Sequence, residues 1–578
     1  MSEKTYPSIN DLTLEEKASL TSGGDAWHLQ GVEAKGIPGY MITDGPHGLR
    51  KSNSATTGEV DLNNCVPATC FPPAAGLSSS WNPELIYRVG EAMAEECIQE
   101  KVAVILGPGV NIKRNPLGGR CFEYWSEDPY LAGHEAVGIV AGVQSKGVGT
   151  SLKHFAANNQ ETDRLRISAN ISQRALREIY FPAFEHIVKE AQPWTIMCAY
   201  NCINGVHAAQ DHWLLTDVLR DEWGFEGIVM SDWGADHDRV ASLNAGLNLE
   251  MPPSYTDDQI VYAARDGRIQ PAQLDRMAQG MIDLVNKTRA AMSIEGYRFD
   301  IEAHDEVAHR AAIESMVLLK NDDAILPVAN DAKVTVIGEF ARTPRYQGGG
   351  SSHITPTKMT SFLDTLTERG VDAKFAPGFT LDLEPADPAL EAEAVDAARG
   401  ADVVLMFLGL PEAAESEGFD RETLDMPAKQ IALLEAVAAE NKNVVVVLSN
   451  GSVVTVAPWA KNAKGILESW LLGQSGGPAL ADVLFGKVSP SGKLAQTIPF
   501  DINDDPSTIN WPGEEGHVDY GEGVFDGLPL LRHLQQGRRL PVRIRPELRH
   551  VRSERREGCQ DRCLYRIRQR SGQEHLER

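Results

Sequence analysis

The sequence predicts an α/β protein, with a (β/α)8-type barrel over residues 1–290 followed by an open α/β sandwich of mostly parallel strands over 311–500. Short, continuous apolar runs alternate with amphipathic stretches, which is the pattern of parallel strands covered by helices on both faces. The alternation lapses over residues 291–310, which we interpret as a linker, and then begins again. Two consecutive α/β domains are therefore expected.

Five apolar runs in the first domain each end in polar or charged residues. They are "YMITDGPHGLR", "VAVILGPGVNIKRNP", "GTSLKHFAANNQETDR", "WTIMCAYNCING" and "GIVMSDWGAD". Helical patterns such as "PELIYRVGEAMAEECIQEK" and "QRALREIYFPAFEHIVKEA" lie between them. In a barrel of this type, functional residues lie at the carboxyl ends of the strands. The side chains expected there are Asp44, Lys153, His154, Tyr200 and Asp232.

The second domain repeats the pattern with different strands. Its expected strands are "KVTVIGEFA", "DVVLMFLGLP", "NVVVVLSNGS" and "GILESWLLG", separated by helical stretches such as "LEAEAVDAARG" and "PAKQIALLEAVAAENK". In an open parallel sheet, ligands approach the carboxyl edge of the strands. The acidic loop "EAAESEGFDRETLDMP" leaves the second of these strands at that edge, so a site is expected there.

Composition excludes several classes of partner. The chain has 578 residues and a formal net charge of -26, which argues against nucleic acid or an anionic membrane as the main partner. No stretch approaches about 18 uninterrupted apolar residues, the length that spans a bilayer. The start, "MSEKTYPSIND", lacks the basic and apolar segments of a signal peptide. Eight cysteines without regular spacing do not indicate a disulfide framework. We expect a cytoplasmic protein.

Asp232 poses a chemical question of its own. It follows the buried-strand pattern "GIVMS", where a carboxylate is costly to desolvate unless something pairs with it or uses it. One interpretation is a helix N-cap that closes a strand–loop–helix turn. The other is a catalytic carboxylate delivered by the strand, and this stretch alone does not decide between them.

Taken together, the motifs resemble glycoside hydrolase family 3, the β-glucosidase family. The segments "ITDGPHGLR", "GGRCFEYWSEDPYL", "LKHFAANNQETDR", "VMSDWGA" and "ESEGFDR" occur in the family's order and at its approximate spacing. The resemblance covers about residues 10–526. It implies a retaining, exo-acting β-glucosidase that needs no cofactor and acts on a small β-glucoside or a short oligosaccharide. No metal-ligand cluster is visible in the sequence, and a homo-oligomer is left open.

Retention requires two carboxyls roughly 5 Å apart, one ionised to attack the anomeric carbon and one protonated to release the leaving group. The resemblance implies that Asp232 is the nucleophile, and the cations Lys153, Arg120 and Arg164 are expected to keep its pKa low. By the family's pattern Glu417 is the acid/base, with Glu415 as the alternative. Repulsion by Glu415 and by nearby Glu412 is expected to favour the protonated form of Glu417.

The resemblance also implies a sugar-binding set. Asp44 is expected to bind the 4- and 6-hydroxyls of glucose, with Arg50 holding Asp44 in place. The remaining hydroxyls need charged donors and the sugar's C–H faces need an aromatic wall. Ser351, in "QGGGSSH", is expected either to reach in from the second domain or to belong to a flexible glycine loop. The rest of the set is Arg120, Lys153, His154, Arg164, Met197, Tyr200 and Trp233.

Three other functions stay open. One is a related family 3 glycosidase, such as a β-xylosidase. A second is an N-acetylglucosaminidase, which would use an Asp–His pair within the barrel and often lacks the second domain; "ESEGFDR" argues against it. The third is a catalytically impaired sugar-binding remnant, because the end of the chain is abnormal.

Residues 501–527 are expected to begin a connection to a third domain, but residues 528–578 do not continue it. The family continues with segments like "YRYYD" and "FPFGYGLSY" and a fibronectin-type β-sandwich. Here residues 527–578 contain 14 arginines, 6 acidic residues and no lysine. A basic tail for nucleic acid is one interpretation. However, synonymous codons for "LPLLR" and "LPVRIRPELR", shifted by one nucleotide, can encode both family segments. We expect a frameshift near residues 525–528, a disordered Arg-rich tail and a missing third domain.

Overall fold

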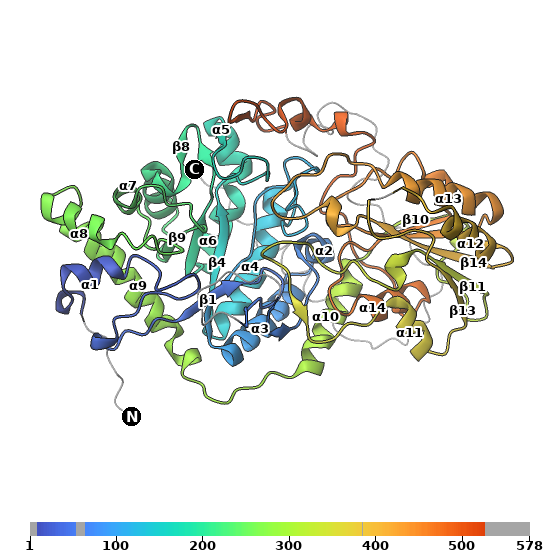
Figure 1. Ribbon diagram of the computed structural model, residues 1–578, viewed down its shortest axis with the longest axis horizontal. Helices are drawn as coiled ribbons and strands as arrows, with labels where there is room; N and C mark the ends of the chain where they lie inside the picture. The colour runs from blue at the N-terminus through green and yellow to red at the C-terminus, as the bar shows by residue number, and fades with distance from the viewer. Residues whose placement is uncertain (1–7, 54–63, 384, 526–578) are drawn as a thin grey trace, which may run out of the picture.

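The computed structural model describes residues 8–53, 64–383 and 385–525. Two α/β domains lie side by side (Figure 1), the first coloured blue to green and the second yellow to orange. The predicted succession of a barrel-type domain and an open α/β domain is confirmed. The predicted tail over 528–578 lies outside the described residues. None of the described helices has the length and apolar character needed to cross a bilayer.

A sheet of five parallel strands forms the centre of the first domain, in the order β1-β3-β4-β6-β9. Each strand coincides with one of the five predicted apolar runs. The strands are β1 (Met41–Asp44), β3 (Val102–Leu106), β4 (Gly149–Phe155), β6 (Thr195–Cys198) and β9 (Ile228–Ser231). Single bridges extend this sheet toward a closed ring, from Met230 to Leu249, from Glu250 to Ser22 and from His28 to Met41.

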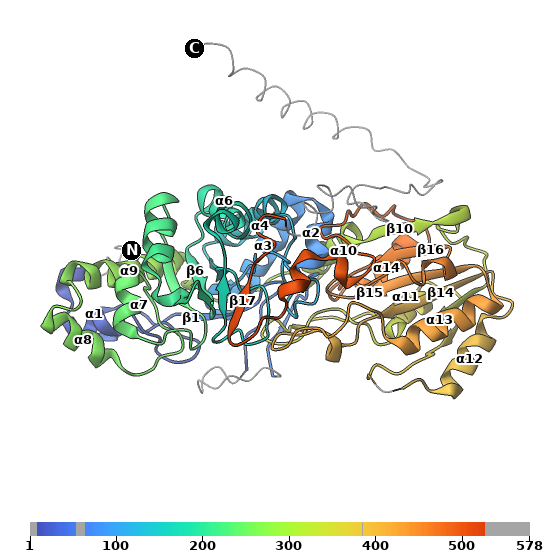
Figure 2. The same cartoon turned by 90° about the horizontal axis from the view of Figure 1, so that it is seen from above.

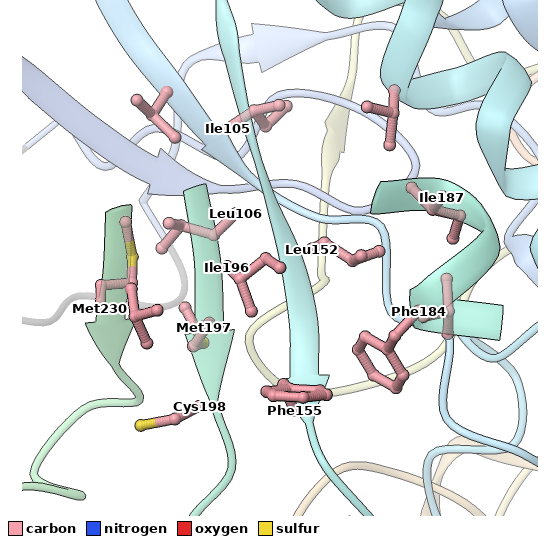
Figure 3. Close-up of a cluster of buried hydrophobic side chains, with 14 of the residues drawn as sticks. Ile105, Leu106, Leu152, Phe155, Phe184, Ile187, Ile196, Met197, Cys198 and Met230 are labelled. Atoms are coloured by element: carbon pink, nitrogen blue, oxygen red, sulfur yellow. The ribbon is translucent and has the colours of Figure 1, made fainter. Parts of the chain in front are cut away.

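Helices surround this sheet because each strand buries both of its faces. They are α1 (Leu14–Ser19), α2 (Ala74–Ser80), α3 (Pro83–Glu100), α4 (Pro129–Ser145), α5 (Gln173–Ala175), α6 (Pro182–Ala191), α7 (Arg239–Ala245), α8 (Asp257–Asp266) and α9 (Pro271–Met292). Figure 3 shows the core that results: Phe184 and Ile187 of α6 meet Leu152 and Phe155 of β4. The start of α3 is fixed by Asn82, whose side chain caps the helix, and by Pro83 in the first turn.

The second domain is a six-stranded sheet in the order β10-β16-β15-β14-β11-β13. Its strands are β10 (Val317–Asn321), β11 (Val334–Ile337), β13 (Ala373–Ala376), β14 (Val403–Gly409), β15 (Val444–Ser449) and β16 (Gly465–Glu468). All neighbours are parallel except β10 and β16. Its helices are α11 (Phe362–Glu368), α12 (Pro388–Ala398), α13 (Ala428–Glu440) and α14 (Gly476–Leu484). The sequence analysis did not identify the two edge strands, β10 and β13.

The connection between the domains is shorter than predicted. Residues 293–300 contain no helix or strand, but α10 (Ile301–Ser315) begins inside the predicted linker 291–310. Asp300 caps this helix, and its amphipathic pattern packs it against α2, α3 and α14. The helix therefore joins the two domains as a packed element.

Residues 501–525, predicted to begin a connection to a third domain, return to the first domain. There β17 (His517–Asp519) pairs in parallel with β5 (Ser168–Asn170). Figure 2 shows β17 lying beside the first domain. Close by, Glu522 forms a buried ion pair of 2.5 Å with Arg114, whose guanidinium lies 3.8 Å from the centre of the Tyr520 ring. The described end of the chain thus closes onto the barrel.

Candidate active site

The carboxyl ends of the barrel strands bring the predicted polar residues to one edge of the sheet. Asp44 ends β1, Lys153 and His154 lie near the carboxyl end of β4, and Asp232 directly follows β9. Because these strands are parallel neighbours or lie in one sheet, their carboxyl ends share an edge. The loop after β14, from the second domain, adds Glu417 to the same cluster: Arg120 lies 3.6 Å from Glu417.

Asp232 is almost fully buried at this edge. Its Oδ1 accepts a hydrogen bond of 2.8 Å from the backbone N–H of Trp233, and its Oδ2 lies 3.7 Å from Nε2 of His154. Burial raises the pKa of Asp232, although Lys153 and Arg120 act in the opposite direction. The prediction of a low pKa was therefore wrong, because desolvation outweighs the nearby cations.

Glu417 is held between the domains. Its Oε2 accepts a 2.7 Å hydrogen bond from the backbone N–H of Ser351, and its Oε1 accepts one of 2.9 Å from Nη1 of Arg164. Burial opposes ionisation, but Arg120, Arg164 and Ser351 together hold the pKa of Glu417 far below its usual range. The expectation that Glu412 and Glu415 favour the protonated form of Glu417 was wrong. Sequence neighbours suggested carboxylate repulsion, whereas arginines from the other domain dominate.

Glu415, the alternative acid/base, has a different environment. Its side chain is buried, and its oxygens accept hydrogen bonds of 2.6 Å from the N–H of Gly451 and 3.1 Å from the N–H of Ser452. Arg345 lies 3.7 Å away. These contacts tie the acidic loop to the loop that follows β15.

Asp44 is, with Asp232, one of the two predicted carboxyl groups at the edge of the barrel sheet. Nη1 of Arg50 donates a hydrogen bond of 2.9 Å to Oδ2 of Asp44, and Nζ of Lys153 lies 3.8 Å from Oδ1. Burial raises the pKa of Asp44 against these two cations. Arg50 therefore lies where the family resemblance predicted, behind the carboxyl that it orients.

Tyr200 and Trp233, the aromatic residues predicted to line the sugar site, contact each other. The Tyr200 hydroxyl donates a 3.2 Å hydrogen bond to the backbone oxygen of Trp233, and Nε1 of Trp233 donates one of 3.1 Å to Ala26. Trp27, which the sequence analysis did not select, packs against Trp233 with ring centres 5.3 Å apart. Met197 instead lies in the apolar interior of the barrel (Figure 3).

His154 is a neutral member of the cluster. Its backbone N–H donates a 2.8 Å hydrogen bond to Asn111, and the Tyr124 hydroxyl lies 3.3 Å from Nδ1. Burial, reinforced by Arg120 and Lys153, places the pKa of His154 well below its ordinary value. A neutral imidazole can exchange hydrogen bonds with a sugar hydroxyl without adding another charge.

Sequence reasoning missed Glu161 and Asp420, two carboxyls that lie inside the motifs "LKHFAANNQETDR" and "ESEGFDR". Glu161 accepts a 2.6 Å hydrogen bond from Arg164 and a 2.9 Å bond from the N–H of Gly418. Burial raises its pKa to about 7. Their position in the two motifs was the available signal, but the hydrogen bonds between the domains, from Gly418 to Glu161 and from the barrel loops to Asp420, join parts of the chain that are remote in sequence.

The arrangement supplies two carboxyls in different electrostatic environments, surrounded by cations and hydroxyl-binding groups. Such a pair can perform nucleophilic and general acid–base chemistry on a glycosidic bond. Across the described ranges, no group of three or more His, Cys, Asp or Glu side chains is arranged to hold a metal ion.

Comparison with known proteins identifies the family. Residues 52–284 match the family model described as Glycosyl hydrolase family 3 N terminal domain, and residues 316–527 match the Glycosyl hydrolase family 3 C-terminal domain. The chain belongs to glycoside hydrolase family 3. It is a glycosidase, and its substrates are carbohydrates.

Similar family 3 proteins have two kinds of name. The chain is 87% identical, over 91% of its length and 71% of the relative's, to an exo-alpha-(1->6)-L-arabinopyranosidase from Bifidobacterium breve. It is 50% identical, over 90% of its length and 69% of the relative's, to thermostable beta-glucosidase B from Acetivibrio thermocellus. A crystal structure of a family 3 beta-glucosidase from Bifidobacterium adolescentis is 86% identical, with a TM-score of 0.90, covering 93% of this chain and 78% of that one.

Proposed function

We propose that this family 3 glycosidase is a retaining, exo-acting β-glucosidase in which Asp232 is the nucleophile and Glu417 the acid/base. The observation that carries the proposal is that Arg120 lies 3.6 Å from Glu417 and also acts electrostatically on Asp232, so that one barrel arginine influences a carboxyl from each domain. Asp232 directly follows a strand that is buried along its whole length, and Glu417 receives hydrogen bonds from both domains.

In the first half of the reaction, Asp232 attacks the anomeric carbon while the carboxylic acid of Glu417 protonates the departing oxygen. The bond from the anomeric carbon to that oxygen breaks, and a glycosyl ester of Asp232 forms. In the second half, the Glu417 carboxylate takes a proton from water, whose oxygen then displaces Asp232.

The free site favours the form of Glu417 that the second half needs. Arg120 and Arg164 stabilise its carboxylate form. The first half of the reaction therefore requires that the electrostatic interaction of these two arginines with Glu417 become weaker. Sugar hydroxyls can accept hydrogen bonds from both guanidinium groups. Substrate binding then shifts the pKa of Glu417 upward and makes the acid form accessible.

A second candidate, an α-L-arabinopyranosidase, is favoured by the 87% identity to the enzyme of that name. Both sugars present an equatorial anomeric bond, so the same two carboxyls could cleave either. α-L-Arabinopyranose lacks the hydroxymethyl group at carbon 5 of β-D-glucose and has its 4-hydroxyl axial. Asp44, proposed to bind the 4- and 6-hydroxyls and held in place by Arg50, is therefore the contact on which the choice depends.

The test is a matched panel of 4-nitrophenyl glycosides: β-D-glucopyranoside, β-D-xylopyranoside and α-L-arabinopyranoside. A higher kcat/KM for the glucoside supports the first proposal, and a higher value for the arabinopyranoside replaces it with the second. The xyloside, which lacks only the hydroxymethyl group, isolates that contact and tests the β-xylosidase alternative. A folded protein that cleaves none of the three would be the impaired remnant. Proton NMR of the first sugar released tests retention.

A further inference from the structure

Asp420 is a carboxyl of the second domain whose hydrogen bonds are made by the first. Its Oδ1 accepts bonds of 2.9 Å from the N–H of Gly119 and 2.9 Å from the N–H of Glu161. Its Oδ2 accepts bonds of 2.8 Å from the N–H and 2.7 Å from the hydroxyl of Thr162. Four donors from two barrel loops thus converge on one side chain.

These two loops carry the arginines that contact Glu417. Gly119 immediately precedes Arg120, and Thr162 lies two residues before Arg164. Asp420 itself lies three residues after Glu417. Gly119 and Thr162, both bonded to Asp420, thus lie within two residues, along the chain, of the two arginines that contact Glu417.

The backbone of the barrel at Gly119 lies so close to the backbone of the acidic loop that no side chain larger than a hydrogen atom fits between them. A Cβ atom added to Gly119 would lie 1.8 Å from the carbonyl oxygen of Phe419 and 2.6 Å from that of Ser416. On the far side of Asp420, the N–H of Arg421 donates a 2.8 Å bond to Leu117. Because the N–H of Gly418 also donates a hydrogen bond to Glu161, the acidic loop is bonded to the barrel on both sides of the carboxyl.

We propose that Asp420 is a positioning residue that fixes Glu417 at the interdomain site, acting through the barrel loops 115–124 and 156–164. It has no part in bond making. The inference rests on the proposed role of Glu417, because a positioned acid matters only where proton transfer to the leaving group limits the rate. Charge-assisted bonds from backbone N–H groups are suited to this role, since they are short and directional.

Asp420→Asn is the test variant, because it keeps the shape and turns one bonded oxygen into a donor that faces other donors. We expect kcat/KM for a poor leaving group, methyl β-D-glucoside, to fall about 10- to 100-fold more than for 2,4-dinitrophenyl β-D-glucoside. That differential loss is smaller than the roughly 10²- to 10⁴-fold effect of removing an acid/base outright. Azide should partly restore turnover of the activated substrate, as it should in Glu417→Ala. If the purified enzyme prefers another sugar, the methyl and 2,4-dinitrophenyl glycosides of that sugar replace the two glucosides.

Two further variants separate positioning from folding. Thr162→Val deletes only the hydroxyl bond to Asp420 and should show the same selectivity with a smaller amplitude, even if Asp420→Asn unfolds. Glu422→Gln changes an exposed carboxyl on the same loop and should leave both substrates unaffected. Equal losses on the two substrates, or no loss, in both Asp420→Asn and Thr162→Val would overturn the inference alone. A Glu417→Ala enzyme without selective loss would overturn the proposed acid/base and this inference with it.

Discussion

Arg164, on the barrel, donates a 2.9 Å hydrogen bond to Glu417, on the second domain. The same nitrogen atom donates a 2.6 Å bond to Glu161, a buried carboxyl of the barrel. One guanidinium group therefore bonds to two carboxyls that lie on opposite sides of the domain boundary. Because its charge favours the ionised form of Glu417, the barrel sets the protonation state of a group that the other domain supplies.

Replacing Arg164 by Gln should move the pH profile of the enzyme. The pKa of Glu417 lies below its usual range in the free enzyme, and removing one of the cations responsible must raise it. Since the first half of the reaction needs protonated Glu417, the alkaline limb of kcat/KM against pH should shift to higher pH. The overall rate should fall as well, because Arg164 is also a proposed sugar contact, so the measured quantity is the position of the limb.

The matched control is Arg166→Gln. Arg166 lies two residues after Arg164, and its exposed guanidinium group is paired with Asp163. Its pH profile should coincide with that of the unmodified enzyme. An alkaline limb that stays in place in Arg164→Gln would show that Arg164 does not control the proton on the acid.

Asp232→Asn should reduce turnover by on the order of 10³-fold or more, since the amide cannot form the glycosyl ester. The change is nearly isosteric, and one oxygen can still accept the N–H of Trp233. The circular dichroism spectrum and the thermal unfolding midpoint should therefore change little. A folded variant with a substantial share of the original activity would remove Asp232 from the nucleophile role.

Glu417→Ala should discriminate between leaving groups. Alkyl glucosides need the proton and should lose roughly 10²- to 10⁴-fold in kcat/KM, while 2,4-dinitrophenyl glucoside should lose far less. In the second half, azide can replace the water that Glu417 would activate, so added azide should give a β-glycosyl azide with retained configuration. Product identification by NMR checks this, and an α-configured azide would contradict a double displacement.

A pH-dependent gain in stability is expected from Glu135→Gln. Glu135 is buried on α4, and burial raises its pKa to about 8. A folded pKa above the unfolded value means that its contribution to stability is complete at acidic pH and is lost as pH rises toward 8. The amide cannot ionise, so the variant should gain roughly 1–3 kcal/mol relative to the unmodified protein between pH 5 and pH 8.5.

Thermal unfolding at these two pH values measures the effect. Glu190→Gln, an exposed carboxyl on the neighbouring helix α6, is the control and should show no pH-dependent difference. A Glu135→Gln protein whose advantage is the same at both pH values would mean that Glu135 does not hold its proton in the folded state.

The sequence predicted the strands that carry the site better than it predicted the electrostatics of the site. Strands such as the one in "GIVMS" are buried on both faces. A continuous run of apolar residues indicates such burial, so these strands could be identified from the sequence. By contrast, β13 has the sequence "AKFA" and lies half exposed at the sheet edge, where no such pattern is required. Motif resemblance supplied the residues of the site, but it did not supply their charge states.

The pKa of Glu417 illustrates why. Glu412 and Glu415 lie within five residues of it in sequence, yet Arg120 and Arg164, some 250–300 residues away, determine its charge. Electrostatic interactions depend on distance in space and on burial, and neither can be read from neighbours in the chain. Asp420 escaped notice for the same reason, since all four of its barrel donors are remote in sequence.

Glu415→Gln should separate the two glutamates of the acidic loop. Glu415 binds the N–H groups of Gly451 and Ser452 with its two oxygens, and an amide can satisfy only one of them. Leaving a buried N–H without its acceptor costs about 1–3 kcal/mol, so the thermal unfolding midpoint should fall. Activity should fall by a similar factor on methyl and 2,4-dinitrophenyl glucosides, because the proton donor is unchanged. If Glu415→Gln instead lost activity selectively on the methyl glucoside and responded to azide, while Glu417→Ala did not, Glu415 would be the acid/base and the assignment of Glu417 would be wrong.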